Sequence, residues 1–312
     1  MNNKRFILSL AIVVLFVLAV LAAGFLGTEK TTDKLKVVAT TTQLYDITKN
    51  LVGDNVSVSV IYSADTDPHD FQPTPSDVQN IQDAELIIFN GVDLEHTIED
   101  SIEEAKAIKL NASESLVILE PIEAESHEDE EEDEHEEGDP HIWFDVKNVI
   151  KITESIKNKL IELDSTNAAL YATKASNYIS ELEELDTFIR TQIGTIPEEN
   201  RKIVTNHDAF GYYINAYGLQ FVGSVIPSLS TEDQPTPSET SELIERIKTE
   251  NVKAIFTEVT LNPKLAQQIA NEAGIMVIST LFGDTLGREG TEGDTYIKMM
   301  KSNTLEIVNA LK

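Results

Sequence analysis

The sequence predicts an α/β fold of two similar lobes, each a mostly parallel sheet flanked by helices, joined by one long linker helix. Short β-branched and apolar runs alternate with helical patterns in both halves of the chain, as in repeated βα units. Between the halves, apolar residues recur at helical spacing from about residue 164 to 194. With 312 residues and 41% apolar content, the chain is long enough for two domains.

The first lobe is expected over residues 34–163. Gly53 ends its first helix, and Ser76 has the residue type that caps the start of its second. Its strands are predicted at 35–39, 56–62, 85–90 and 116–119, and its helices at 46–52, 76–84 and 146–163.

The linker helix is expected over residues 164–194, with Asp164 or Ser165 as its N-cap and Gly194 at its end. A helix of about 28 residues is roughly 40 Å long, enough to cross between two lobes. The second lobe then occupies residues 195–312. Its strands are predicted at 202–205, 220–225, 253–257 and 276–279, and its helices at 209–217, 238–250, 263–273 and 294–311.

The charge of the chain indicates which ligands it attracts. A net charge of -30 excludes a general nucleic-acid binder, because neutralising phosphates requires clustered Lys and Arg. The same negative charge favours cations as ligands. Residues 123–139 hold twelve carboxylates together with His127 and His135, so we expect a solvated loop that binds metal weakly at most. The sequence has no cysteine, so a tight metal site must use His, Asp, Glu or backbone oxygen.

Residues 1–27 form an export segment. Lys4 and Arg5 precede an apolar run from Phe6 to Leu26, which is close to the roughly 20 residues that span a membrane. We therefore predict a retained transmembrane anchor, with a cleaved signal as the alternative, and a chain exposed outside the cytoplasm at the cell surface. Gly24 stands where a bacterial lipoprotein box would need its lipidated cysteine.

Four polar residues lie beyond the carboxyl ends of predicted strands. Ligands of open α/β sheets bind at that edge, so side chains from two sheets could converge in one cleft between the lobes. Histidine is also the commonest metal ligand, although a lone loop histidine is usually a surface residue. The four candidates are His69, His141, His207 and Asp284.

Other candidates are weaker. His96 has the sequence context of a solvated residue at a helix start. Glu258 ends a predicted strand and could be a hydrogen-bond acceptor behind a ligand, a spare ligand or a structural residue. Trp143 and Phe144 are expected to pack beneath the site.

Several motifs, in order, resemble those of the zinc- and manganese-type solute-binding proteins of ABC transporters. The resemblance covers roughly Val37 to Leu311, and the acidic segment before Asp139 is similar to the metal loop of zinc members. The motifs are Pro68-His69-Asp70-Phe71, Asp139-Pro140-His141-Ile142-Trp143, His207-Asp208-Ala209-Phe210-Gly211-Tyr212, Pro235-Thr236-Pro237-Ser238 and Phe256-Thr257-Glu258.

The resemblance implies a monomeric receptor, not an enzyme, that captures a divalent metal and delivers it to an ABC permease. It implies His69, His141, His207 and Asp284 as ligands, and three imidazoles favour zinc over manganese or iron(II). A metallohydrolase would need an open coordination position, which four protein ligands close. A metal-binding surface or adhesion protein is the other alternative.

Overall fold

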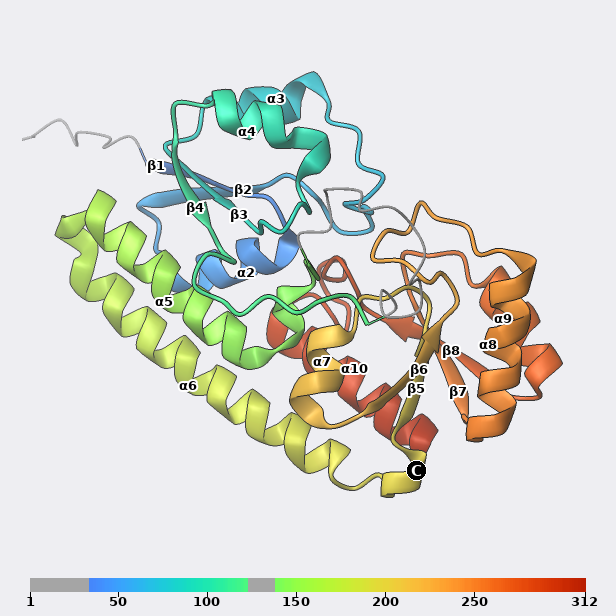
Figure 1. The fold of residues 1–312 in the computed structure, drawn as a ribbon. Coiled ribbons are helices and arrows are strands. Elements are labelled where there is room, and N and C mark those ends of the chain that lie inside the picture. Colours follow the sequence, from blue (N-terminus) through green and yellow to red (C-terminus); the bar gives the residue numbers. More distant parts are fainter. Residues whose placement is uncertain (1–33, 123–137) are drawn as a thin grey trace, which may run out of the picture. The chain divides into compact units, whose positions relative to one another are not determined.

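The computed structural model describes residues 34–122 and 138–312. The predicted export segment and the acidic residues 123–137 lie outside these ranges. Within them, no helix combines the length and apolar character needed to cross a membrane. Residues 35–312 form one compact unit built on two sheets (Figure 1).

Both sheets are fully parallel and have four strands. Their spatial orders, β2-β1-β3-β4 and β6-β5-β7-β8, are the same when each sheet is numbered from its own first strand. The prediction of two similar lobes is therefore confirmed at the level of topology. The strands are β1 (Leu35–Ala39), β2 (Val56–Val60), β3 (Leu86–Phe89), β4 (Ile108–Asn111), β5 (Lys202–Thr205), β6 (Gln220–Ser224), β7 (Ala254–Glu258) and β8 (Met276–Leu281).

The helices connect consecutive strands or join the two sheets, except for α10, which follows the last strand. Three-residue 3-10 turns add to them at His96–Ile98, Ile142–Phe144, Ser165–Asn167 and Glu198–Asn200. The helices are α2 (Thr42–Leu51), α3 (Pro75–Gln82), α4 (Glu99–Glu104), α5 (Val146–Leu163), α6 (Ala168–Ile193), α7 (Gly211–Tyr217), α8 (Pro237–Glu250), α9 (Lys264–Ala273) and α10 (Tyr296–Leu311).

Strand alternation divides the apolar residues between the two faces of each sheet. In β3, Leu86 and Ile88 join the largest core, while Ile87 packs on the opposite face among residues of α3 and α4. In β7, Phe256 joins the same large core, and Ile255 packs with α8 and α9. One core therefore runs behind both sheets, and each sheet has a smaller core on its other face.

The long helix α6 belongs to the shared core. It packs against α5, α2 and α10, so it contacts elements from both halves of the chain (Figure 1). Its buried residues recur at helical spacing, among them Tyr171, Tyr178, Leu185 and Ile193. The helix ends with Gly194 as its C-cap. The prediction of one long helix joining the lobes is confirmed.

One strand was predicted at the wrong place. Residues 116–119 are irregular, and the fourth strand is β4 at Ile108–Asn111. As an edge strand, β4 keeps Ile108 and Lys109 exposed, so its sequence lacks the apolar character expected of a buried strand. The Leu119 N–H instead donates to the Tyr212 hydroxyl, and the Leu119 carbonyl accepts from the Asp139 N–H. His141 accordingly follows this irregular stretch and not a strand end.

Asp46 is a half-buried carboxylate that ties α2 to the start of α10. Its Oδ2 accepts a hydrogen bond from the Tyr296 backbone N–H at 3.0 Å. Burial raises the pKa of Asp46 to about 6, the hydrogen bond from Tyr296 lowers it, and nearby Asp294 raises it further. The ionised form at neutral pH is therefore less stable in the folded protein than in the unfolded chain.

We expect Asp46→Asn to stabilise the protein at pH 7.5 by about 2 kcal/mol. The folded pKa lies above the unfolded one, so the gain should shrink as the pH falls through 6 and vanish near 4. Urea unfolding at several pH values measures this. Asp54→Asn, at an exposed turn position, is the control and should change little. A gain independent of pH, or a loss at pH 7.5, would contradict the account.

Candidate metal centre

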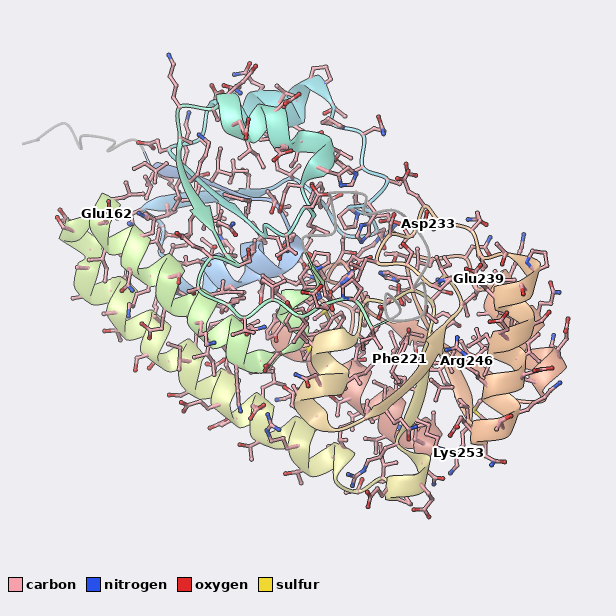
Figure 2. The ribbon with its side chains drawn as sticks, in the orientation of Figure 1. Glu162, Phe221, Asp233, Glu239, Arg246 and Lys253 are labelled. Carbon is pink, nitrogen blue, oxygen red and sulfur yellow. The ribbon has the colours of Figure 1, made fainter. Side chains whose placement is uncertain are left out.

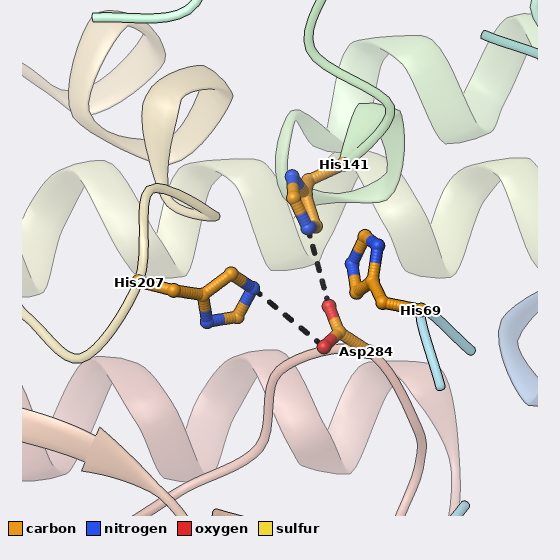
Figure 3. A group of neighbouring side chains, drawn as sticks. All are labelled: His69, His141, His207 and Asp284. Atoms are coloured by element: carbon orange, nitrogen blue, oxygen red, sulfur yellow. Dashed lines mark ion pairs between the residues drawn. The ribbon is translucent and has the colours of Figure 1, made fainter. Parts of the chain in front are cut away.

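Three histidines and one aspartate meet between the two sheets (Figure 3). Each of His69, His141, His207 and Asp284 offers one ligand-type atom, and these atoms all lie within 4.8 Å of one another. The three imidazole ring centres are 5.3, 5.7 and 6.0 Å apart, so the rings are spaced almost evenly. The structure thus brings together all four residues predicted from the sequence.

The sheets explain why these loops meet. His69 follows β2, His207 lies two residues after β5, and Asp284 lies three residues after β8, each beyond the carboxyl end of its strand. In the second sheet, β5 and β7 lie side by side at the point where the strand order reverses, which opens a crevice at that edge. Only His141 comes from a segment that no strand precedes directly.

The distances around Asp284 suit a small cation. Oδ1 lies 3.3 Å from His141 Nε2, and Oδ2 lies 3.6 Å from His207 Nε2 (Figure 3). Ligand atoms of a tetrahedral ion with bonds of about 2.0–2.2 Å are about 3.4 Å apart. None of the three Nε2 atoms has a hydrogen-bond partner within the described ranges. Buried polar atoms normally have partners, so this set fits a bound metal ion.

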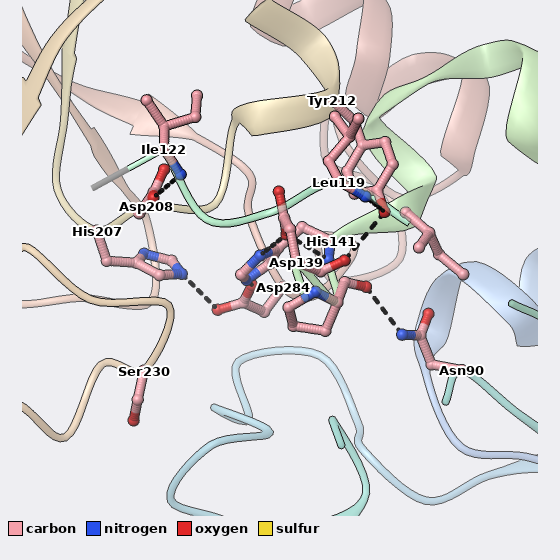
Figure 4. Close-up of polar contacts among 12 residues, drawn as sticks. Asn90, Leu119, Ile122, Asp139, His141, His207, Asp208, Tyr212, Ser230 and Asp284 are labelled. Atoms are coloured by element: carbon pink, nitrogen blue, oxygen red, sulfur yellow. Dashed lines mark hydrogen bonds and ion pairs between the residues drawn. The ribbon is translucent and has the colours of Figure 1, made fainter. Parts of the chain in front are cut away.

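His141 is held by its neighbour Asp139. Asp139 Oδ1 lies 2.8 Å from His141 Nδ1 and also accepts the His141 backbone N–H at 2.9 Å (Figure 4). Asn90 donates to the carbonyl oxygen of Pro140 at 2.8 Å and fixes the segment from the first sheet. A Cβ atom on Gly211 would lie 2.5 Å from Asp139 Oδ2, so α7 can approach only because it begins with glycine. With Nδ1 occupied in this way, Nε2 faces the other ligands.

His207 has a carboxylate partner as well. Glu258, the last residue of β7, places Oε2 2.9 Å from His207 Nδ1. Of the three roles considered for Glu258, the geometry favours a position behind the ligand group, where its carboxylate pairs with His207. A Cβ atom on Gly283 would lie 2.8 Å from Glu258 Cγ, so the loop carrying Asp284 passes close to Glu258 because residue 283 has no side chain.

The Asp284 loop is bonded to the first half of the chain. Gln43, buried in α2, donates its Nε2 to the carbonyl oxygen of Asp284 at 3.0 Å. The Leu286 backbone N–H donates to Thr42 Oγ1 at 2.7 Å. These bonds fix the Asp284 backbone against α2. Neither residue was predicted from the sequence, because a threonine and a glutamine at a helix start give no local sign of such contacts.

The site is closed to solvent. His69 is 6% exposed, Asp284 3%, and the other two histidines are fully buried. Burial lowers the pKa of His69 to about 3. Burial also lowers the pKa of His141, but contacts with Asp139 and Asp284 outweigh it and raise the pKa to about 10. For His207, the Glu258 and Asp284 carboxylates likewise outweigh burial and raise the pKa. A metal ion that binds these nitrogens must displace protons.

The remaining candidates from the sequence are not part of the ligand group. His96 is exposed, with Nδ1 3.3 Å from the Asp93 carbonyl oxygen, and it takes no part in the site. His127 and His135 lie outside the described residues. Trp143 is 2% exposed and packs edge-on against the His141 ring, and Phe144 stacks on Phe210. The aromatic residues therefore support the ligand loop from below.

Comparisons with known proteins agree on one family. The family model described as zinc-uptake complex component A, periplasmic, matches residues 37–310. The manganese-binding lipoprotein MntA of Halalkalibacterium halodurans is 33% identical over 302 residues, covering 96% of this chain and 97% of the relative. The metal ABC transporter substrate-binding lipoprotein SsaB of Streptococcus sanguinis is 31% identical over 287 residues, covering 89% and 90%.

Solved structures give the same fold. The periplasmic zinc-binding protein TroA from Treponema pallidum aligns with a TM-score of 0.79 at 28% identity, covering 89% of this chain and 99% of that one. A manganese-bound periplasmic metal-binding protein from Candidatus Liberibacter asiaticus aligns with a TM-score of 0.78 at 26% identity, covering 89% and 100%.

We expect Asp139→Ala to weaken binding of a divalent metal about 10- to 100-fold, because His141 loses the group that orients its ring. Asp139→Asn should lose less, since its amide oxygen can still accept from Nδ1. Titration against a chromophoric chelator measures both. Asp70→Ala, an exposed carboxylate next to His69, is the matched control. Unchanged affinity in Asp139→Ala would show that this contact does not support the site.

Proposed function

The chain belongs to the family of periplasmic zinc-uptake components, the substrate-binding proteins of metal ABC transporters, and we propose that it captures one zinc ion outside the cytoplasm for its permease. Proteins of this family bind and deliver a substrate and are not enzymes. The proposed ligands are Nε2 of His69, His141 and His207 and the carboxylate of Asp284.

One observation carries the ligand proposal. Four donor groups from four separate loops meet in a buried site. The Nε2 atoms of the three histidines have no hydrogen-bond partner in the described part of the chain. A buried polar atom without a partner destabilises the folded protein, and a cation removes that cost for all four groups together. Four protein ligands also fill a tetrahedral shell, which suits transport of the ion and not reaction at it.

The donor set favours zinc. Imidazole nitrogen suits zinc, whereas manganese prefers carboxylate and other oxygen ligands. Glu258 supplies the second carboxylate nearby, but its Oε2 lies against His207 Nδ1, behind the ligand group. Three nitrogens and one oxygen therefore face the common centre.

Manganese is the second candidate for the transported ion. The relatives named above include a manganese-binding lipoprotein at 33% identity, and a solved neighbour of the same fold is manganese-bound. Asp284 is compatible with either ion, and zinc outcompetes manganese at most nitrogen sites regardless of biological role. Iron(II) would take the same site by the same chemistry.

The proposal also includes the way the protein is held at the membrane. Relatives are named lipoproteins, but this sequence has no cysteine to carry such a lipid. The apolar run from Phe6 to Leu26 is the candidate anchor, and residues 1–33 lie outside those that the structure describes. The mass of the protein recovered from cell membranes distinguishes a retained segment from a cleaved one.

We expect metal-free protein to bind one tight equivalent of zinc in equilibrium dialysis. His69→Ala, His141→Ala and His207→Ala should each weaken that equivalent by more than about 100-fold, because each removes a direct ligand. His96→Ala, an exposed histidine away from the site, is the control and should bind like the wild type. Unchanged binding in the three site variants would overturn the ligand assignment.

Binding competition and the growth of a deletion strain distinguish zinc from manganese as the transported ion. Zinc should displace manganese from the protein, and a deletion strain should grow poorly when zinc is scarce and recover when zinc is added. Recovery with manganese but not with zinc would overturn the zinc assignment even if zinc bound more tightly to the purified protein.

A further inference from the structure

The segment that carries His141 lies outside both sheets, and side chains hold its backbone in place of a neighbouring strand. Four carbonyl groups of residues 139–143 accept a hydrogen bond from a side chain of α5, α7, α10 or the loop after β3. The pairs are Tyr212 to Asp139, Asn90 to Pro140, Asn148 to Ile142 and Tyr296 to Trp143, at 3.1, 2.8, 3.2 and 2.7 Å (Figure 4). The position of His141 therefore depends on how firmly these donors are themselves held.

One of the four donors, Asn90, begins a strained loop. It follows β3 directly and is 1% exposed. The next three residues, Gly91, Val92 and Asp93, have φ angles of 80°, 53° and 56°. A positive φ suits glycine, but it costs free energy in other residues and most in a β-branched one such as Val92. Such a conformation persists only where surrounding contacts fix it, and it occurs most often at functional sites.

Glu95 supplies the contacts that fix the start of this loop. Its Oε1 accepts the Asn90 backbone N–H at 2.8 Å, and its Oε2 accepts the Gly91 N–H at 3.0 Å. Thr40, the residue after β1, donates its hydroxyl to Oε1 at 2.6 Å. One carboxylate therefore holds two successive backbone groups of the loop and connects them to the strand beside β3.

A buried carboxylate is a costly way to hold a loop. Glu95 is 5% exposed, and burial raises its pKa to about 7, although its hydrogen-bond donors lower it. The ionised form is therefore less stable in the folded protein than in the unfolded chain. This cost and the strain at Val92 occur together beside the metal centre, where they point to a role for the shape of the loop.

We propose that Glu95 is a positioning residue for metal binding and acts through Asn90. Its carboxylate keeps the loop in the conformation in which the Asn90 amide reaches the Pro140 carbonyl, one residue before His141. The inference rests on the proposed function, because it concerns the ion that His141 would bind. The hydrogen bonds of Glu95 go to the loop and to Thr40, so its effect on the ion is indirect.

Glutamine is the most informative substitution at position 95. All the groups bonded to the carboxylate are donors, namely the Thr40 hydroxyl and the backbone N–H groups of Asn90 and Gly91. A glutamine amide has only one acceptor oxygen, so its NH2 group must face one of the two backbone N–H groups. Glu95→Gln therefore keeps the size of the side chain but removes part of its hold on the loop.

The affinity of the full-length protein for zinc, measured by competition with a chromophoric chelator, tests the proposal. Glu95→Gln should raise the Kd for zinc at least about fivefold, because His141 is less firmly placed. The matched control Glu99→Gln makes the same change at an exposed position of α4 and should change the Kd less than about twofold.

A second control separates lost stability from lost positioning. Ile247 is buried in the small core between α8 and the second sheet, and Figure 2 labels its neighbour Arg246 on α8. Ile247→Ala should lower the free energy of unfolding and leave the Kd for zinc unchanged, because it removes core packing away from the ligand loops. Urea unfolding of the metal-free variants measures the stability of each.

A double-mutant cycle tests the route through Asn90. Asn90→Ala removes the donor to Pro140, so adding Glu95→Gln to it should raise the Kd less than about twofold further. Cobalt(II) bound in place of zinc reports the geometry of its ligands by visible absorption. Glu95→Gln should alter that spectrum, and Ile247→Ala should not. If Glu95→Gln does not fold, Thr40→Val removes one donor to the carboxylate and should raise the Kd at least about twofold.

A wild-type Kd in Glu95→Gln, or in Thr40→Val where the first variant does not fold, would overturn the role of Glu95. Full additivity with Asn90→Ala, or a higher Kd with an unchanged cobalt spectrum, would overturn it as well. Each of these results leaves the proposed function intact. Failure of the wild-type protein to bind zinc would instead contradict the proposed function.

Discussion

The structure depends on one electrostatic constraint, the burial of three imidazoles and a carboxylate at a single point between two sheets. Nearby carboxylates raise the pKa values of His141 and His207 in spite of their burial. Protons and a metal ion are thus alternative ways to satisfy the same buried groups.

The rest of the fold holds these four groups in place with little freedom. Carboxylates orient two of the rings, Asp139 behind His141 and Glu258 behind His207. Gln43 and Thr42 at the start of α2 bond the loop of Asp284, so the first half of the chain positions a ligand of the second. Because α6 packs against helices from both halves, the lobes share one core as their support.

The sequence predicts the parts of this arrangement that are local. His207 and Asp284 could be placed because the strands before them have clear β-branched patterns, and a ligand position follows from a strand end. The strand β4 was misplaced because its exposed edge position allows a lysine and an exposed isoleucine, whereas Leu116–Leu119 is a continuous apolar run typical of a strand without being one. Gln43 could not be predicted, because its partner lies 241 residues away and depends on how the lobes meet. The role of Glu258 was undecided for the same reason.

X-ray absorption at the zinc edge of the loaded protein tests the central claim most directly, because it reports the atoms around the ion. We predict a four-coordinate shell of three imidazole nitrogens and one carboxylate oxygen, at about 2.0–2.2 Å. His96→Ala should leave the spectrum unchanged, and His207→Ala should remove one imidazole contribution. A shell dominated by oxygen with one imidazole or none would contradict the account.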